Sequence, residues 1–334
     1  RTLLLSSANT MQLMLHAMRL PHLILRLLIY RLHALAHTST PFFSKQNFPL
    51  LFALNPLVLV LLIALHCSLC QSAIITTAAI TFFTLKLVAW VDPDAALRTY
   101  APHVDYYYPR MGGFILGYYF FLLFSRWVGS DSHVLYEQLW ACNVSMLFSS
   151  IGMFFNIPLL TGLSCALVAV DQLCWYIDIL GWIATGFKKF PIGVAGYLVW
   201  PTTSTMKRIT AAHHLWFLPA MLYTLQWRLP EHSFLVACAV GTALCVISRF
   251  TTPFHCLLPL EQGQKEHRVL YLNINASYAF WKDVKAGFLH IADHRSPAVY
   301  LPYLMVLGNV ILNLPANLVL IALLRVIEEA TKAV

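Results

Sequence analysis

Residues 139–182 read LWACNVSMLFSSIGMFFNIPLLTGLSCALVAVDQLCWYIDILGW, two long apolar segments that meet at a single Asn-Ile-Pro break. Such a pattern predicts a helical hairpin in lipid, because each helix satisfies its own backbone amides where no water is available. Pro158 follows the break directly, and proline is tolerated in the first turn of a helix. The rest of the chain is expected to be organised around this hairpin.

The second segment of the hairpin carries two acids. Asp171 and Asp178 are seven residues apart, which places both carboxylates on nearly one helix face, about 10 Å apart along the axis. Aspartate in a membrane segment costs roughly 2.5–3.5 kcal/mol, so these side chains should face protein, water or a cation. With Asn143 from the first segment, they form either a hydrogen-bonded structural group or a site that handles protons or ions.

The composition places the protein in a membrane. Hydrophobic residues make up 59% of the chain and charged residues 11%, with a mean hydropathy of +0.68, whereas about 25% of residues are charged in soluble domains. The net charge is +8, but the cations are spread along short loops rather than gathered in a patch. No nucleic-acid partner is therefore expected, and anionic lipid is the better partner.

We predict an all-α fold, a polytopic transmembrane helical bundle with seven to nine membrane segments. The candidates are residues 48–66, 73–91, 111–127, the 139–182 hairpin, 192–200, 211–227, 233–248 and 300–324. Residues 192–200 are too few to cross about 30 Å of hydrocarbon as a helix, so a re-entrant segment or the end of a tilted span is expected. Gly113 and Gly117 form a GxxxG motif that would allow close helix approach. Residues 250–297 should form an extramembrane, partly helical loop.

Residues 1–47 form a separate basic segment. They contain five cations and no acid, and the first acidic residue of the chain is Asp92. An acid-poor, Arg-bearing amphipathic helix is typical of organellar targeting and of helices that lie in the headgroup layer. Arg1 in place of Met fits either a cleaved presequence or a partial chain. We expect the mitochondrial inner membrane, with a bacterial plasma membrane or a plastid membrane as alternatives, and a membrane domain over residues 48–334.

No metal or cofactor site is expected from the histidines and cysteines. His213 and His214 are neighbours in a predicted helix, so their side chains should point about 100° apart and not share one ligand site. A haem would need an opposing histidine, for which His66 or His255 is available, but both lie near segment ends. The CxxC of residues 67–70 has no second CxxC to complete a tetrahedral site, and the eight cysteines predict no disulfide framework.

Four loop cations stand beside aromatic residues at the ends of predicted helices. They are Lys188, Lys189, Lys207 and Arg208. Basic groups in this position suit lipid phosphates, including those of cardiolipin. We therefore predict bound phospholipid here, with non-specific interfacial charge as the alternative.

Part of the chain resembles a group of poorly characterised bacterial multi-pass membrane proteins. The likeness rests on residues 140–145, 175–178, 214–218 and 272–275, followed by residues 300–320. It covers roughly residues 135–325 and implies an all-helical membrane core without carrying over an activity. The basic N-terminal segment would then be an organellar addition to a bacterial-type core.

The sequence contains no complete catalytic set, nucleotide-binding loop or HExxH motif. We therefore expect a non-catalytic accessory subunit of a large organellar complex of the respiratory chain, with other membrane subunits and phospholipids as partners. The alternative is a proton- or ion-coupled transporter that uses Asp171 and Asp178. A membrane enzyme with His213 or His214 as its base is a third hypothesis.

Overall fold

A computed structural model describes residues 68–93, 107–128, 132–201, 203–257 and 269–332 of the chain. The chain divides into two compact units, Arg1–Gln71 and Ser72–Val334, and nearly all of the described residues belong to the second. The predicted N-terminal helix, the predicted span at residues 48–66 and the domain boundary after residue 47 lie outside the described residues.

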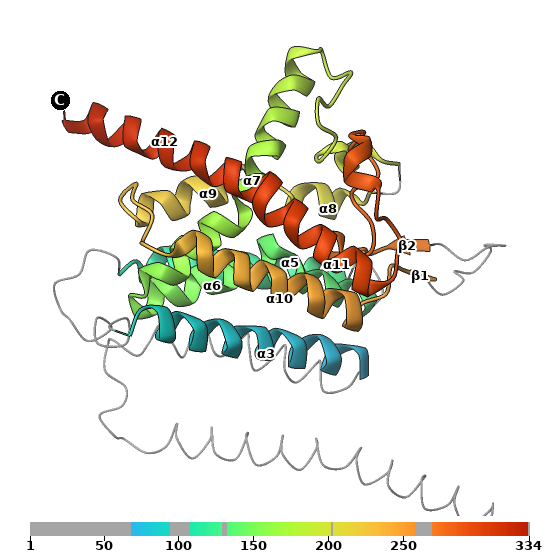
Figure 1. The fold of residues 1–334 in the computed structure, drawn as a ribbon, viewed down its shortest axis with the longest axis horizontal. Helices are drawn as coiled ribbons and strands as arrows, with labels where there is room; N and C mark the ends of the chain where they lie inside the picture. The colour runs from blue at the N-terminus through green and yellow to red at the C-terminus, as the bar shows by residue number, and fades with distance from the viewer. Residues whose placement is uncertain (1–67, 94–106, 129–131, 202, 258–268, 333–334) are drawn as a thin grey trace, which may run out of the picture. The chain divides into compact units, whose positions relative to one another are not determined.

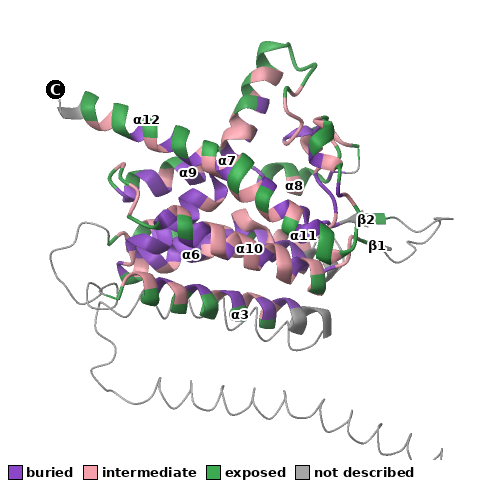
Figure 2. Cartoon of the chain, viewed as in Figure 1, coloured by how far each residue is buried: buried purple, intermediate pink, exposed green. Residues whose placement is uncertain are grey.

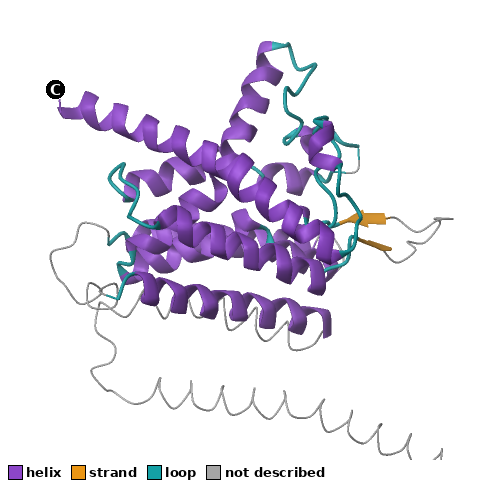
Figure 3. Ribbon diagram, viewed as in Figure 1, coloured by secondary structure: helices purple, strands orange, loops and turns teal. Residues whose placement is uncertain are grey.

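The described part of the chain is mostly helical (Figures 1 and 3). Its α-helices are α3 (Ser68–Val91), α5 (Pro109–Val128), α6 (Ala141–Phe155), α7 (Pro158–Ala184), α8 (Thr205–Thr210), α9 (His213–Thr224), α10 (Ser233–Thr251), α11 (Pro297–Met305) and α12 (Leu314–Lys332). Shorter turns of 3-10 helix are η1 (Ser132–Leu139), η2 (Gly196–Val199), η3 (Ile274–Ala276) and η4 (Gly287–His290), and the π-helical η5 (Val306–Asn313) joins α11 to α12. Two strands, β1 (His255–Leu257) and β2 (Val269–Tyr271), pair antiparallel.

The predicted hairpin is confirmed as α6 and α7. Helix α6 ends at Phe155, the left-handed backbone of Asn156 (φ 53°) reverses the chain, and Pro158 is the first residue of α7. Gly152 allows the two helices to approach closely, because a Cβ there would lie 2.7 Å from Thr161 Oγ1. The break works as a tight corner since its residues tolerate backbone conformations that a helix interior would not.

Four described stretches are long and apolar enough to cross a membrane. They are Ala73–Val91, Pro158–Ala184, Ser233–Thr251 and Pro297–Ala330. The structure is therefore compatible with an integral membrane protein. Helix α6 is apolar but has only 15 residues, and α9 has 12, which gives about 18 Å along the axis of α9 and is short of the roughly 30 Å hydrocarbon core.

The core lies between α3, α6, α7 and α10 (Figure 2). It contains Ile80, Val88, Val144, Phe148, Leu159, Leu160, Leu163, Ala166, Val236, Ala237, Val240 and Leu244, all buried. Large apolar side chains such as Phe82, Leu180 and Leu235 instead face outward with more than half of their surface exposed. A helix between the core and lipid needs apolar side chains on both faces, because one face packs in the core and the other contacts lipid.

Three expectations differ from the structure. Residues 192–200 form a loop with the short η2 instead of a membrane segment, and the 250–297 region contains the β1–β2 pair, so the fold is not purely helical. Nothing lies within 4 Å of a Cβ placed on Gly117. Gly112 is instead the glycine that approaches α6, since a Cβ there would lie 3.2 Å from Met153 Cβ. The position of α6 decides which face of α5 makes the close contact, and Gly117 of the GxxxG motif does not take part in it.

The substitution Gly162→Ala should destabilise the fold. A Cβ at Gly162 would lie 2.7 Å from Pro230 Cδ and would also collide with Ser233 Oγ, and overpacking of this kind costs about 1–3 kcal/mol. We expect a lower thermal midpoint for the purified protein in detergent, measured by size-exclusion chromatography after heating. Gly117→Ala is the matched control and should leave the midpoint unchanged or raise it. Equal midpoints for the two variants would contradict the close approach at Gly162.

Candidate functional site

A buried cluster of charges lies where α5, η1 and α8 meet. Glu137, with 4% of its side chain exposed, accepts from Lys207 Nζ at 2.9 Å and forms a second ion pair with Arg126. Arg126 Nε also donates to Thr210 Oγ1 at 3.0 Å, which joins the last turn of α5 to α8. A buried carboxylate is tolerated here because two cations compensate its charge.

The environment of Glu137 sets its protonation. Burial alone would raise the pKa of this carboxyl, but the charges of Lys207 and Arg126 and their hydrogen bonds lower it from 4.5 to about 2. Glu137 is therefore ionised at neutral pH. Asn143 supports the same turn by donating from Nδ2 to the Glu137 carbonyl at 2.6 Å, so it holds η1 in place and is not paired with the aspartates of α7 by any hydrogen bond.

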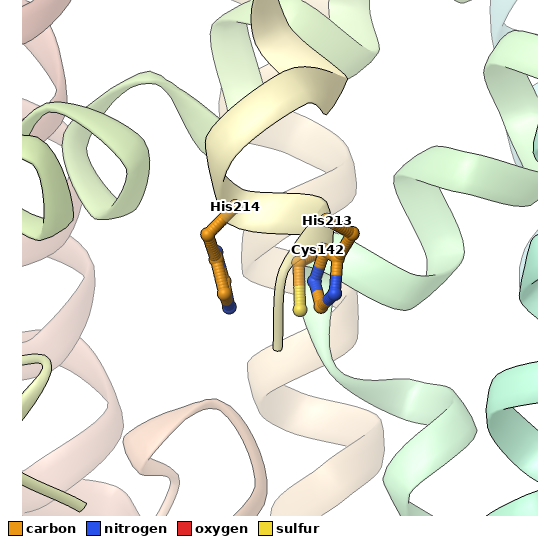
Figure 4. A group of neighbouring side chains, drawn as sticks. All are labelled: Cys142, His213 and His214. Carbon is orange, nitrogen blue, oxygen red and sulfur yellow. The ribbon is translucent and has the colours of Figure 1, made fainter. Parts of the chain in front are cut away.

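Beside this cluster, the first turn of α9 places two imidazoles together. The rings of His213 and His214 have centroids 4.1 Å apart, and both side chains are buried. Figure 4 shows both rings and the thiol of Cys142, from the first turn of α6, directed the same way. One ligand atom from each of the three lies within 4.8 Å of the others. The two rings lie closer together than the expected 100° separation of neighbouring helical residues implies, because rotation about the side-chain bonds brings them to the same side.

Asp171 and Gln172 of α7 reach the same group of residues. His214 Nδ1 lies 3.0 Å from Gln172 Nε2 and 3.4 Å from Asp171 Oδ2. The ring of Trp175 stacks on His214 at a centroid distance of 5.7 Å, and Tyr118 from α5 packs near His213. Side chains of α5, α6, α7 and α9 thus surround one polar centre, which we define as Cys142, Asp171, Gln172, His213 and His214.

Asp178 is not part of this polar centre. Its carboxylate accepts from the backbone amides of Ile192, Gly193 and Ala195 at 2.7–3.1 Å and is fully buried. Gly193 has φ +103°, and a Cβ there would collide with the backbone of Asp283. Asp178 therefore holds the 192–195 turn against α7, while Asp171 faces α9, so the two acids do not form a joint site.

The four cations predicted to bind lipid phosphate are separated by the structure. Lys188 and Lys189 are exposed neighbours in the loop after α7, and Arg208 is exposed and donates to the Trp200 carbonyl at 3.2 Å. Lys207 instead pairs with Glu137. Only the first two therefore stand together with their charges directed to the surroundings, and lipid binding there stays a prediction.

Away from the polar centre, a hollow lies between the α9–α10 connection and α12, with a volume of about 510 Å³. Arg228 and Glu328 pair across its edge at 2.6 Å. Its charged groups, Arg228, Glu231 and Glu328, lie at least partly in the open, so it offers less than the buried polar centre for holding a small charged ligand.

Sequence reasoning missed Arg126, Glu137, Cys142 and Gln172. Neither Cys142 nor Glu137 belongs to a sequence motif that would single it out. The available signal was a single acid immediately before the Leu139 hairpin with an arginine at the end of the preceding apolar segment. Such a pair can be identified as an ion pair only when the turn between them is known.

Replacing Glu137 should destabilise the protein strongly. Glu137→Gln leaves Arg126 and Lys207 without their counter-charge, and breaking a buried ion pair costs about 3–5 kcal/mol. We expect a lower thermal midpoint in detergent at pH 7, and Glu231→Gln, at an acid with 88% of its side chain exposed, should leave the midpoint unchanged.

The destabilisation caused by Glu137→Gln should also depend on pH. The folded-state pKa of Glu137 is about 2, below the ordinary 4.5, so its contribution is present above pH 4.5 and is lost as the pH falls toward 2. The difference in midpoint between wild type and Glu137→Gln should narrow across this window. A difference that stays constant would exclude an ionised Glu137.

Asp178→Asn should release the 192–195 turn. The amide offers one acceptor oxygen where the carboxylate offers two, and it directs an NH₂ group at backbone N–H donors. We expect faster tryptic cleavage after Lys188 or Lys189, measured by limited proteolysis and mass spectrometry. Asp171→Asn in the same helix is the control, and equal cleavage rates in the two variants would refute the role of Asp178.

Comparison with known proteins finds no matching family model, no matching curated protein and no matching solved structure. The resemblance of residues 135–325 to bacterial multi-pass membrane proteins therefore stays a prediction. The functional conclusions rest on the geometry of the polar centre and on the membrane-compatible helices around it.

Proposed function

We propose that the protein is an ion-coupled membrane transporter in which Asp171 belongs to the cation-binding site. The observation that carries this proposal is the position of Asp171 at the midpoint of the 27-residue α7, a candidate membrane span. A carboxylate at this depth is expensive against lipid, and acids so placed mark ion paths in membrane proteins.

The surroundings of Asp171 support a binding role. Its side chain keeps 27% of its surface exposed, and its polar contact among the described residues is His214 Nδ1 at 3.4 Å, longer than an ordinary hydrogen bond. Asp178, by contrast, is fully enclosed and saturated by backbone donors. An incompletely satisfied carboxylate in the middle of a span is available to a cation, whereas a saturated one is not.

The other polar groups fit a binding centre better than a general base. His213 and His214 are both buried, so an organic substrate larger than an ion would have little access to either ring. The third hypothesis, a membrane enzyme with a histidine base, is therefore less well supported by the geometry than ion binding.

The finer expectations stay proposals. We keep seven to nine membrane segments as the proposed count, with α5 as a further span and α6 and α9 as shorter members of the bundle, and the mitochondrial inner membrane as the proposed location. An accessory role in a respiratory-chain complex, with bound phospholipid, is the alternative function, and the described contacts do not bear on it.

Reconstitution in liposomes tests the proposal. Wild-type protein should move at least one of a panel of monovalent and divalent cations down an imposed gradient, and Asp171→Asn should reduce that flux. Losing an interaction with a charged group costs about 1.5–3 kcal/mol of free energy, so we expect the flux of Asp171→Asn to fall about 10- to 150-fold. Flux is measured with ion-sensitive dyes inside the vesicles.

Glu231→Gln, at an exposed acid of the α9–α10 connection, is the control and should retain wild-type flux. Undiminished flux in Asp171→Asn would refute the assignment of Asp171. Absence of wild-type flux for every ion, together with co-migration in a large complex on native gels, would favour the accessory-subunit alternative.

A further inference from the structure

We infer that Cys142, His213 and His214 bind a single zinc-class transition-metal ion. This inference deepens the proposed function and rests on the same polar centre, for which it names the class of cation. The three residues come from two helices, α6 and α9, and approach one another within 4.8 Å through one ligand atom each (Figure 4).

His213 presents a free nitrogen to the site. Its Nδ1 lies 2.7 Å from the carbonyl oxygen of Thr210, and because a carbonyl can only accept, Nδ1 must carry the proton. In the neutral ring Nε2 then has a lone pair. Nε2 is buried and has no hydrogen-bond partner among the described residues, and His213 is 2% exposed. An unpaired buried nitrogen is costly unless something binds it.

His214 is oriented in the way that metal-bound histidines usually are. Asp171 Oδ2 and the side-chain amide of Gln172 both contact its Nδ1. Within the described part of the chain the Gln172 side-chain oxygen has no hydrogen-bond partner, and exchanging the amide oxygen and nitrogen would place an acceptor against Nδ1 as well. Two acceptors favour a proton on Nδ1, which leaves Nε2 for a ligand bond. A carboxylate behind a histidine fixes the ring and strengthens its donor nitrogen.

The donor set selects the class of metal. One thiolate and two imidazoles suit zinc and related d-block ions, whereas Ca²⁺ and Mg²⁺ prefer oxygen ligands. Tetrahedral zinc with bonds of about 2.0–2.3 Å places its ligand atoms about 3.3–3.6 Å apart. The three side chains would therefore close by about 1 Å, and the fourth position would stay open, as it does in zinc sites that exchange ligands.

The neighbouring charges permit a dication. Arg126 and Lys207 on one side are balanced by Glu137 and Asp171. Arg126 donates to Thr210, whose carbonyl accepts from His213, and its positive charge also acts directly on the three ligand side chains. Binding of the ion would displace the thiol proton of Cys142, and the resulting thiolate would offset one of the two charges of the dication.

Metal analysis of the full-length protein tests the inference. The chain is purified in detergent without a polyhistidine tag, loaded with Zn²⁺ or Co²⁺, and its metal content is measured by mass spectrometry. We expect one ion per chain, and for Co²⁺ the intense visible absorption of a tetrahedral ion with a thiolate charge-transfer band. Cys142→Ser and His213→Gln should abolish both signals, while Cys165→Ser, at a buried thiol of α7 outside the site, should keep them.

Gln172→Leu provides a milder variant that preserves all three ligands. It should weaken metal affinity about 10- to 100-fold, as is typical for groups behind a ligand. Wild-type protein that takes up no metal, or Co²⁺ without a thiolate band, would overturn the inference whether or not the variants fold. Metal binding without any ion flux would support the metal site and refute transport. Ion flux that survives Cys142→Ser would support transport and refute the metal site.

Discussion

The polar centre depends on the two ion pairs that the buried carboxylate of Glu137 forms. The carboxylate holds Arg126 of α5 and Lys207 of α8 together, and Arg126 in turn fixes Thr210. The carbonyl of Thr210 accepts from His213 Nδ1 and from the hydroxyl of Tyr118. The orientation of the first histidine of α9 is therefore transmitted from an ion pair in the turn before α6. A single uncompensated charge at this place would cost more than any nearby packing contact.

Asp171 and Asp178 show how environment separates two identical side chains. They lie two turns apart on α7, yet Asp178 is saturated by three backbone amides of one loop and Asp171 keeps a long contact to His214. The first is a structural acid, because a carboxylate with several N–H donors has no need of another ligand. The second remains available for binding. The number of N–H donors around a carboxylate thus distinguishes an acid that holds a turn from one that keeps acceptor positions open.

The hairpin is anchored from a distance by Asn275. Its side chain donates to the Leu139 carbonyl at 2.7 Å and accepts from the Ala141 amide at 2.8 Å, so it caps α6 from a residue 134 positions later in the chain. The backbone of Asn275 is left-handed, with φ 53°, a conformation that asparagine tolerates better than most residues. This contact ties the loop after β2 to the helix that carries Cys142, so the 250–297 region contributes to the geometry of the polar centre.

The sequence alone predicts the helical hairpin, its corner at Asn156 and Pro158, and the candidate span at Ala73–Val91. The reason is that a run of apolar residues in lipid has only its own backbone as a hydrogen-bond partner. Asp171, His213 and His214 could also be selected beforehand, since polar groups within apolar segments are costly. The way in which these residues come together could not be predicted from the sequence. The pairing of Glu137 with Arg126 and Lys207, the meeting of Cys142 with two histidines and the separate role of Asp178 depend on how loops fold back over helix ends. Periodicity describes the face of one helix, whereas a site is formed by side chains from several helices, and only their packing brings those atoms within reach.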